Sequence, residues 1–230
     1  MSGRLILAVD NSLDFLNVAL GEDGRLIEER HARSDRLPSE VLPVRVARLL
    51  GDHGYSVADV SLLLVTLGPG SFTGVRVGLA FSKGLARGLA IPLVGIPTLD
   101  VLAFPFAFLE GHYLCPLVDA KKGEVFLALY RVSGGAVSRI GDFQALKPRE
   151  LESRMPSPGL CFGSGVRLCR NVLAEIEGVR TIEDGFQRVS GEALLKLGLS
   201  LYDQGPLPEA LPIYGRRSEA EIKFGLDVSR

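Results

Sequence analysis

The chain has 230 residues, of which 47% are hydrophobic and 23% charged, a composition typical of a folded globular protein. Its net charge is −1, from 26 basic and 27 acidic side chains, so it lacks the basic excess of a protein that holds nucleic acid alone. Three cysteines without a CxxC pair, and apolar runs too short for a signal peptide or membrane span, predict a cytoplasmic protein without membrane contact.

The first half of the chain predicts an α/β lobe. Short strands are expected at 5–9, 13–20 and 26–31, and the turn GEDG (21–24) joins the last two as a hairpin. A helix at 39–53, an apolar strand at 60–67, a helix at 72–90 and a strand at 93–95 follow. We place this first lobe at about residues 1–104.

The second half predicts another set of strands. A helix at 98–109, which Pro105 is expected to kink or shorten, leads to strands at 113–119, 124–132 and 136–143. A last helix, at 190–202, is expected to pack on either lobe. The second lobe would therefore cover 105–230, and the fold class is α/β, with two lobes of mixed sheet flanked by helices.

The two helices of the first lobe carry more apolar surface than one sheet needs. Their charged side chains fall within narrow arcs; in the second helix, Arg76, Lys83 and Arg87 form a single stripe. That helix also contains four glycines, each of which costs about 0.5–1 kcal/mol relative to Ala. They stand at positions 74, 78, 84 and 88. Close approach to another helix is the benefit expected to offset this cost.

Two turns permit both a binding and a structural interpretation. GPGSFTGVR (68–76) opens a helix and could hold an anion on its N–H groups, or it could be a tight turn before a close-packed helix. It lacks the Lys-Ser or Lys-Thr of a phosphate loop. Asp10-Asn11-Ser12 ends the first strand. It is either a metal and phosphate contact, as in sugar-kinase-like folds, or a turn whose side chains cap its own backbone.

No residue is assigned a catalytic, cofactor-binding or metal-binding role. The three histidines are isolated, which excludes a helical pair of metal-binding histidines. Ser71 and Ser164 lie in glycine-rich turns without an assigned base, so nucleophilic catalysis is unsupported. Cys115 and Cys161 fall in apolar strands and are expected to be buried, inert thiols.

Five segments in a fixed order carry a family signature. GPGSFTGVR matches the hallmark of the bacterial TsaB family without a change. The other four, similar to family segments, are ILAVDNS (6–12), IPLVGIPTL (91–99), DAKKGEVF (119–126) and PIYGR (212–216). In the turn after the first strand, Asn11 replaces the usual Thr, which weakens any claim to independent nucleotide binding. The segment RSDRLPSE (33–40) follows its family pattern only loosely.

The resemblance implies an actin-like and sugar-kinase-like fold of the ribonuclease H-like class. TsaB proteins assist the catalytic paralogue TsaD, together with the ATPase TsaE, in placing a threonylcarbamoyl group on adenosine 37 of ANN-decoding tRNAs. The paralogue's metal-binding HxxxH pair would fall at Thr98 and Leu102, and neither is a histidine here. The resemblance therefore implies a non-catalytic subunit without a cofactor, which forms a homodimer in isolation and meets tRNA only within the complex.

The resemblance also implies which surface binds the partner. The helices at 39–53 and 72–90 are expected to pack against their counterparts in a TsaD-like protein or in a second copy. We expect a bulky residue at Gly78 to abolish the complex while the monomer stays folded. The residues placed at or beside this interface are Leu42, Val46, Leu49, Gly74, Val75, Gly78 and Leu79.

Three other functions remain as alternatives. An ATP-dependent kinase or hydrolase of the same superfamily would need an acidic metal cluster and a phosphate loop in each lobe. Asp10 and Asp119 are its candidate acids, and the second glycine turn, at 163–165, is short for a phosphate loop. A metalloprotease is the second alternative, and the sequence argues against it because the metal ligands are missing. A purely structural homodimer is compatible with the same sequence.

Overall fold

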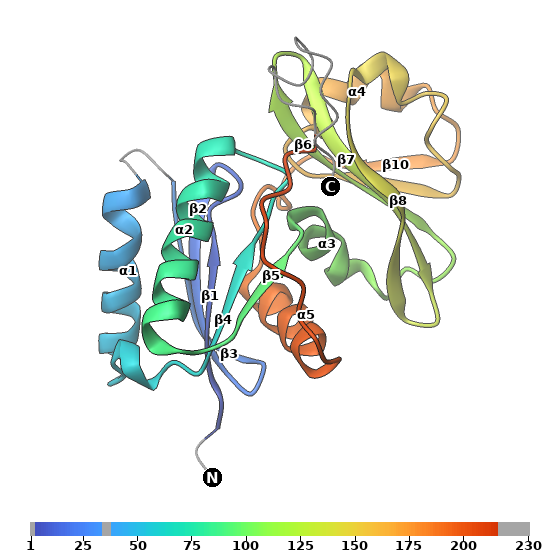
Figure 1. Ribbon diagram of the computed structural model, residues 1–230. Helices are drawn as coiled ribbons and strands as arrows, with labels where there is room; N and C mark the ends of the chain where they lie inside the picture. Colours follow the sequence, from blue (N-terminus) through green and yellow to red (C-terminus); the bar gives the residue numbers. More distant parts are fainter. Residues whose placement is uncertain (1–2, 34–37, 216–230) are drawn as a thin grey trace.

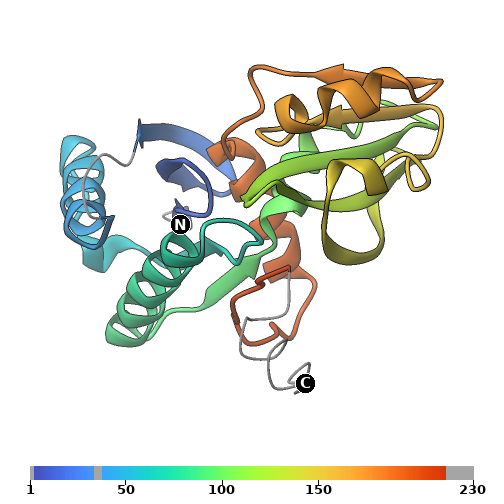
Figure 2. The same cartoon turned by 90° about the horizontal axis from the view of Figure 1, so that it is seen from above.

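A computed structural model describes residues 3–33 and 38–215, which form two lobes side by side (Figures 1 and 2). Each lobe contains one five-stranded sheet with parallel and antiparallel pairs, so the predicted two-lobed α/β fold with mixed sheets is confirmed. Two parts of the family signature lie outside the described residues. They are residues 34–37 of the loosely matching segment RSDRLPSE (33–40), and Arg216 at the end of PIYGR. None of the helices in the described ranges has the length and apolar character needed to cross a membrane.

The first sheet has the strand order β3-β2-β1-β4-β5. An antiparallel meander, β1 to β3, is followed by β4 and β5, which run parallel to β1. The strands are β1 (Leu5–Asp10), β2 (Phe15–Glu22), β3 (Arg25–Arg33), β4 (Leu62–Thr66) and β5 (Leu93–Ile96). Strands β1 and β4 are buried along their whole length, as expected for a central pair covered on both faces.

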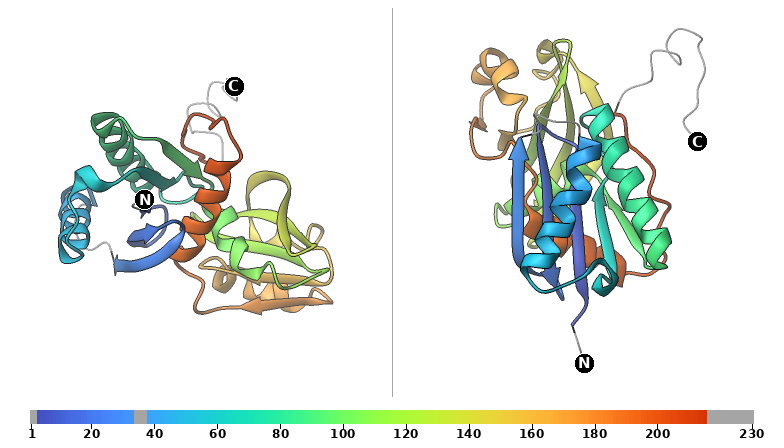
Figure 3. Two further views of the ribbon diagram at one scale, coloured as in Figure 1. Left: turned by 90° about the horizontal axis from the view of Figure 1, so that it is seen from below. Right: turned by 90° about the vertical axis from the view of Figure 1, so that its left-hand side faces the viewer.

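Helices cover both faces of this sheet. On one face lie α1 (Pro38–Asp52) and α2 (Phe72–Leu89), side by side in the right-hand view of Figure 3. The opposite face packs against α3 (Thr98–Ala103) and α5 (Gly191–Asp203), so the last helix returns to the first lobe. Helix α3 is shorter than expected. Because Pro105 cannot continue an α-helix, the chain passes into a 3-10 turn at Phe104–Phe106.

The second sheet repeats the topology of the first. Its order is β10-β9-β6-β7-β8, again an antiparallel meander followed by two strands parallel to its first member. The strands are β6 (Tyr113–Lys121), β7 (Glu124–Ser133), β8 (Ala136–Leu146), β9 (Gly159–Phe162) and β10 (Val179–Ile182). Helix α4 (Val166–Ala174) joins the last two, as α2 joins β4 and β5. In the place of α1 there is only a 3-10 turn, Pro148–Glu150.

The lobes share part of one hydrophobic core. Ile6 and Leu64 of the first sheet belong to the same buried cluster as Tyr130 and Phe162 of the second. Helix α3 lies between the lobes, where the Tyr130 hydroxyl donates to Asp100 Oδ1 over 2.6 Å. The two lobes are therefore held together by buried apolar area rather than by the connecting chain alone.

Helix α2 rests closely on the turn after β1. A Cβ at Gly74 would lie 2.0 Å from the carbonyl oxygen of Asn11, and one at Gly78 would lie 3.4 Å from Asn11 Cβ. The Asn11 side chain in turn donates from Nδ2 to the Gly74 carbonyl over 3.0 Å. Gly84 and Gly88 differ, because both are exposed and a Cβ there would have no neighbour within 4 Å. Gly74 and Gly78 thus allow α2 to lie close to the turn after β1. A bulky residue at Gly78 would therefore also disturb this turn.

Helix α5 is tied to the first sheet by a carboxylate. Glu29 Oε2 on β3 accepts the Gly191 backbone N–H over 2.5 Å, which satisfies the first residue of α5. The His31 ring lies 3.2 Å from Glu29 Oε1. Burial alone would raise the pKa of Glu29, but the Gly191 N–H and His31 outweigh it, so the pKa lies below its ordinary value. The folded state therefore favours the charged form of Glu29.

We expect Gly74→Ala to lower the free energy of unfolding by at least about 2 kcal/mol, because its Cβ would overlap the Asn11 carbonyl. Gly84→Ala is the matched control on the same helix. It should raise the free energy of unfolding by about 0.5–1 kcal/mol, since alanine fits an open helical position better than glycine. Urea unfolding of both variants measures this. Equal effects of the two substitutions would contradict the assignment of Gly74 to the turn contact.

Glu29→Gln should lower the free energy of unfolding by about 1–2 kcal/mol at pH 7, because a charged acceptor at the start of α5 is lost. A depressed folded-state pKa means that the wild type's advantage is present above the unfolded-state pKa. It should disappear as the pH falls through the folded-state value. Urea titrations from pH 7 downwards test this. Exposed Glu177, changed to Gln, should have no effect, and an advantage that persists in acid would contradict the linkage.

Candidate functional site

The carboxylate at the end of β1 is held by its own turn. Asp10 is 1% exposed, and its Oδ1 accepts from the Ser12 backbone N–H (3.0 Å), the Ser12 hydroxyl (2.5 Å) and the Thr66 hydroxyl (2.7 Å). Burial raises the pKa of Asp10 above its ordinary value, although these hydrogen bonds oppose the shift. The arrangement matches the structural interpretation of the turn, in which short polar side chains cap neighbouring backbone.

A polar row crosses the first sheet at this level. Asp10 pairs in register with Asn17, and Asn17 with His31, so the three side chains share the face that carries α5. Asn17 Nδ2 donates to the Val189 carbonyl over 3.0 Å. Among the described residues, Asp10 Oδ2, Asn17 Oδ1 and His31 Nδ1 are buried without a hydrogen-bond partner. No group of three potential metal-ligating side chains comes together within the same part of the chain.

The glycine-rich turn is filled by the chain's own carbonyl oxygens. A Cβ at Gly70 would lie 2.1 Å from the Ser12 oxygen, and that same oxygen accepts the Ser71 N–H over 2.7 Å. On the other side, Gly68 has φ +90° and faces the Ile213 oxygen, 2.4 Å from where its Cβ would lie. An anion placed here would meet acceptors instead of free N–H donors. The geometry therefore favours a tight turn over an anion cradle.

The corresponding turn of the second lobe is closed in the same way. Gly163 has φ +105°, and its Cβ would lie 2.5 Å from the Leu117 carbonyl oxygen on β6. Gly165 donates its N–H to that oxygen over 2.9 Å. Ser164 accepts from the Asp119 N–H over 3.1 Å, so its hydroxyl is engaged in the turn. Backbone carbonyl oxygens therefore close both of these glycine-rich turns.

The segment after α5, residues 205–215, forms a strap across the first lobe. Its Ala210 and Ile213 pack with Leu67 and Leu79, and the Ile213 N–H donates to the Leu67 carbonyl over 2.7 Å. Glu209 pairs with Lys83 of α2 at 3.3 Å. The strap brings the end of the described chain to the glycine-rich turn. Nothing in the sequence pattern signalled this contact, because the strap has neither helical nor strand periodicity.

The seven residues assigned to the partner interface lie on the inner sides of α1 and α2. All are buried in the first lobe: Leu42, Val46, Leu49, Gly74, Val75, Gly78 and Leu79. They pack against the sheet and the turn after β1, on the side of the helices that faces the core. The exposed residues of the two helices define the outer helical face: Ser39, Glu40, Pro43, Val44, Ala47, Arg48, Gly51, Asp52, Phe72, Thr73, Arg76, Ala80, Gly84, Arg87 and Gly88.

The positions that align with a metal-binding histidine pair belong to the core. Thr98 and Leu102 lie on α3 and are 0% and 3% exposed. The Thr98 N–H donates to the Gly68 carbonyl over 2.8 Å. Leu102 lines a small pocket of about 120 Å³ between the lobes, together with His31 and Phe186. Side chains at these two positions pack the junction between α3 and its neighbours.

The cysteines are buried, which confirms the prediction for Cys115 and Cys161. Cys115, Cys161 and Cys169 are free thiols within the second lobe. Burial raises the pKa of the Cys169 thiol to about 12, so it stays protonated at neutral pH. Ser71 caps α2, with its hydroxyl accepting the Gly74 N–H over 3.2 Å. These groups have structural partners and show no nucleophile geometry.

Comparison with known proteins gives one consistent result. The TsaD family model, described as tRNA N6-adenosine threonylcarbamoyltransferase, matches residues 32–162. The Bacillus subtilis tRNA threonylcarbamoyladenosine biosynthesis protein TsaB is 28% identical over 96% of this chain and 91% of its own length. The Escherichia coli TsaB protein is 34% identical over 65% of each chain.

The fold agrees with these matches. A crystal structure of an uncharacterized Pseudomonas aeruginosa protein with similarity to the peptidase YeaZ superposes with a TM-score of 0.77 and 26% identity. The superposition covers 93% of this chain and 100% of that one. A YeaZ structure from the same organism gives a TM-score of 0.74. The hallmark segment at 68–76 lies within the residues that the TsaD family model matches. The chain therefore belongs to the TsaD family, in the branch of the TsaB and YeaZ proteins.

Proposed function

We propose that this chain is a non-catalytic partner subunit in the threonylcarbamoylation of adenosine 37 of ANN-decoding tRNAs. It binds and activates a TsaD-like catalytic paralogue, and a TsaE-like ATPase completes the assembly. Membership of the TsaD family, and relatives named as tRNA threonylcarbamoyladenosine biosynthesis proteins, support the pathway. The chain meets tRNA only within this assembly, which agrees with its net charge of −1.

The observation that carries the non-catalytic role is the burial of Thr98 and Leu102. These positions, where the resemblance puts a metal-binding histidine pair, hold core side chains of α3. The glycine turns add support, because in each of them a carbonyl oxygen, of Ser12 or of Leu117, accepts a backbone N–H of the turn and packs against a glycine.

The outer helical face is the proposed binding surface. Val44 on α1 is 49% exposed and Phe72 at the start of α2 is 54% exposed. Further along α2, the exposed positions 80, 84 and 88 are Ala80, Gly84 and Gly88, which carry a methyl group or no side chain. Another helix can therefore approach the α2 backbone closely at these positions. Within the described residues, the first lobe has α1 where the second lobe has a 3-10 turn, so the pair α1 and α2 has no equivalent there.

Reconstitution tests the activity. Purified TsaD-like and TsaE-like proteins of the same organism, a threonylcarbamoyl-adenylate source, ATP and an ANN-decoding tRNA are combined with and without this chain. Modified adenosine is measured by mass spectrometry of the digested tRNA. We expect modification only when the chain is present, and no turnover by the chain alone. Modification that is independent of the chain, together with nucleotide hydrolysis by the chain alone, would favour an enzyme instead.

Gly84→Trp should abolish complex formation, with at least a tenfold loss of affinity for the TsaD-like protein. A Trp side chain has room at this exposed position in the monomer, but it would keep a partner helix away from the α2 backbone. Ala174→Trp, on the exposed end of α4 in the other lobe, is the matched control. Calorimetric titration gives both affinities, and urea unfolding checks both folds. Unchanged binding by Gly84→Trp would exclude this face.

A further inference from the structure

We propose that the strap is a latch that fixes the angle between the two lobes. The end of the strap stands between the glycine-rich turn of the first lobe and β7 of the second. The inference concerns the chain alone and does not depend on the proposed function. It starts from the places where the chain crosses from one lobe to the other.

The two connections between the lobes lie next to each other. The chain leaves the first lobe through α3 and the 3-10 turn Phe104–Phe106, and it returns through residues 183–190, between β10 and α5. Both segments line the pocket of about 120 Å³, the first with Leu102 and the second with Phe186. Adjacent crossing points of this kind are a usual position for a hinge. A contact on the opposite side of the junction therefore has the longest lever arm against rotation of the lobes.

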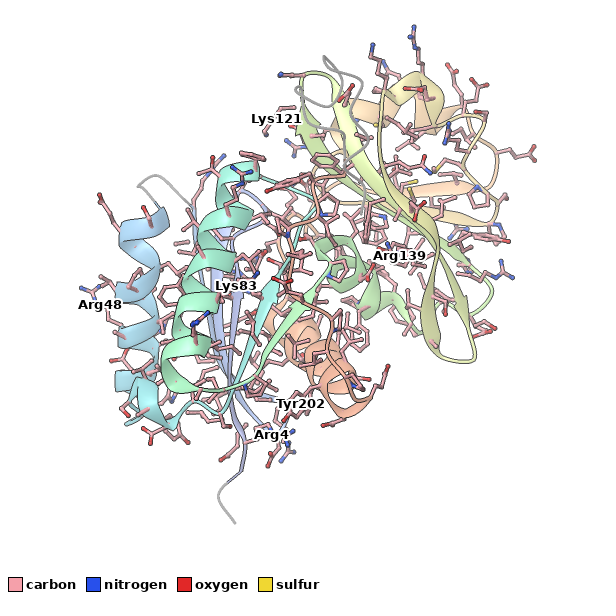
Figure 4. The ribbon with its side chains drawn as sticks, viewed as in Figure 1. Arg4, Arg48, Lys83, Lys121, Arg139 and Tyr202 are labelled. Carbon is pink, nitrogen blue, oxygen red and sulfur yellow. The ribbon has the colours of Figure 1, made fainter. Side chains whose placement is uncertain are left out.

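The strap runs along that opposite side. Figure 2 shows the strap (red) on one side of the junction and segment 183–190 (orange) on the other. The strap is attached to the first lobe, where the Ile213 N–H donates to the Leu67 carbonyl over 2.7 Å. Lys83, labelled on α2 in Figure 4, lies 3.3 Å from Glu209 of the strap. The strap is therefore anchored to the first lobe before its end reaches the second.

Tyr214 is held in one place by two side chains of α2. Its ring stacks on Phe72 with ring centres 5.1 Å apart, and its hydroxyl accepts from Arg76 Nε over 2.9 Å. The Arg76 guanidinium carbon in turn lies 3.8 Å from the centre of the Phe72 ring. Aromatic and cation–π contacts both depend on the relative orientation of the groups. This arrangement sets the position of the next residue, Gly215.

Gly215 stands between the lobes. Its φ is +63°, in the left-handed region that favours glycine. A Cβ at this position would lie 2.9 Å from Phe126 Cδ1 on β7 and 2.9 Å from the Cβ of Pro69 in the glycine-rich turn. The strap backbone thus lies against both lobes and leaves no room for a side chain. Phe126 is 4% exposed and belongs to the core shared by the lobes, so the contact reaches a packed residue of the second lobe.

Two consecutive residues therefore join three parts of the molecule. Tyr214 contacts the start of α2, and Gly215 contacts both Pro69 and Phe126. A rotation of the second lobe towards the strap would overlap packed atoms, and a rotation away from it would open a void beside Phe126. Both movements cost free energy, so the latch favours one angle between the lobes. Displacement of Tyr214 from α2 would release the latch and allow the lobes to rotate about their two connections.

The distance between the lobes, measured by pulsed electron paramagnetic resonance, tests the latch. Nitroxide labels on Ala58→Cys in the first lobe and Arg180→Cys in the second stand at exposed positions, whereas the three native cysteines are buried. Labelled chain is diluted with unlabelled chain, so that pairs within one molecule dominate the signal. We expect one narrow distance distribution without further substitution. Gly215→Val should make it at least twofold broader, because the added side chain would overlap Phe126 and Pro69.

Two further variants separate the latch from general effects of substitution. Tyr214→Ala should also broaden the distribution at least twofold, because the strap loses its stack on α2 although no bulk is added. Gly54→Val is the matched control. Its φ of +75° is similar to that of Gly215, but a Cβ there has no neighbour within 4 Å, so the distribution should stay narrow. Urea unfolding checks that each variant is folded.

Three outcomes would overturn the inference. The first is a broad distribution without any latch substitution, because the lobes would then rotate despite the strap. The second is a distribution that stays narrow in folded Gly215→Val and Tyr214→Ala. The third is equal broadening by Gly54→Val, which would show a general loss of order. If Gly215→Val does not fold, Tyr214→Ala decides the question alone, since it places no atom in the contact between the lobes.

Discussion

The first lobe depends on one contact, between helix α2 and the turn after β1. Gly74 lets the helix approach the Asn11 carbonyl more closely than any side chain would allow, and the Asn11 side chain returns a hydrogen bond to the helix. The same approach places the Ser12 oxygen in the glycine-rich turn. One steric constraint thereby sets the orientation of the helix and fills the turn that an anion would otherwise enter.

The two lobes have one topology but different surfaces. Both have a meander followed by two parallel strands. In both, a backbone carbonyl closes the glycine turn: that of Ser12, just after β1, in the first lobe, and that of Leu117, within β6, in the second. They differ where α1 stands in the first lobe, because the second has only a short 3-10 turn there. The pair of helices is thus a feature of the first lobe alone. The shared core through α3 and α5 joins the second lobe to the opposite face of the first sheet.

Helices α1 and α2 each have two functions on opposite sides. Their inner residues bury apolar area against the sheet, and this burial holds the helices in place. Their exposed residues are mostly small or basic, with Val44 and Phe72 as exposed apolar side chains and Glu40 and Asp52 as acids. The strap completes the outer surface by bringing Tyr214 to Phe72 and Arg76. Residues far apart in the sequence therefore form one outer surface in the folded chain.

The sequence by itself determined the order of strands and helices as far as β8, the last helix, and the burial of Cys115 and Cys161. It also determined the family motif and the non-histidine residues at 98 and 102. Each of these is a local pattern or a residue identity. Only the tertiary structure decided which arc of α1 and α2 is core. The apolar arcs were correctly seen as wide, but periodicity records that a residue is apolar and not what it packs against. The partners of Gly74 and Arg76 were hidden for the same reason. Asn11 is 63 residues from Gly74, and Tyr214 is 138 residues from Arg76, so only the folded chain brings them together.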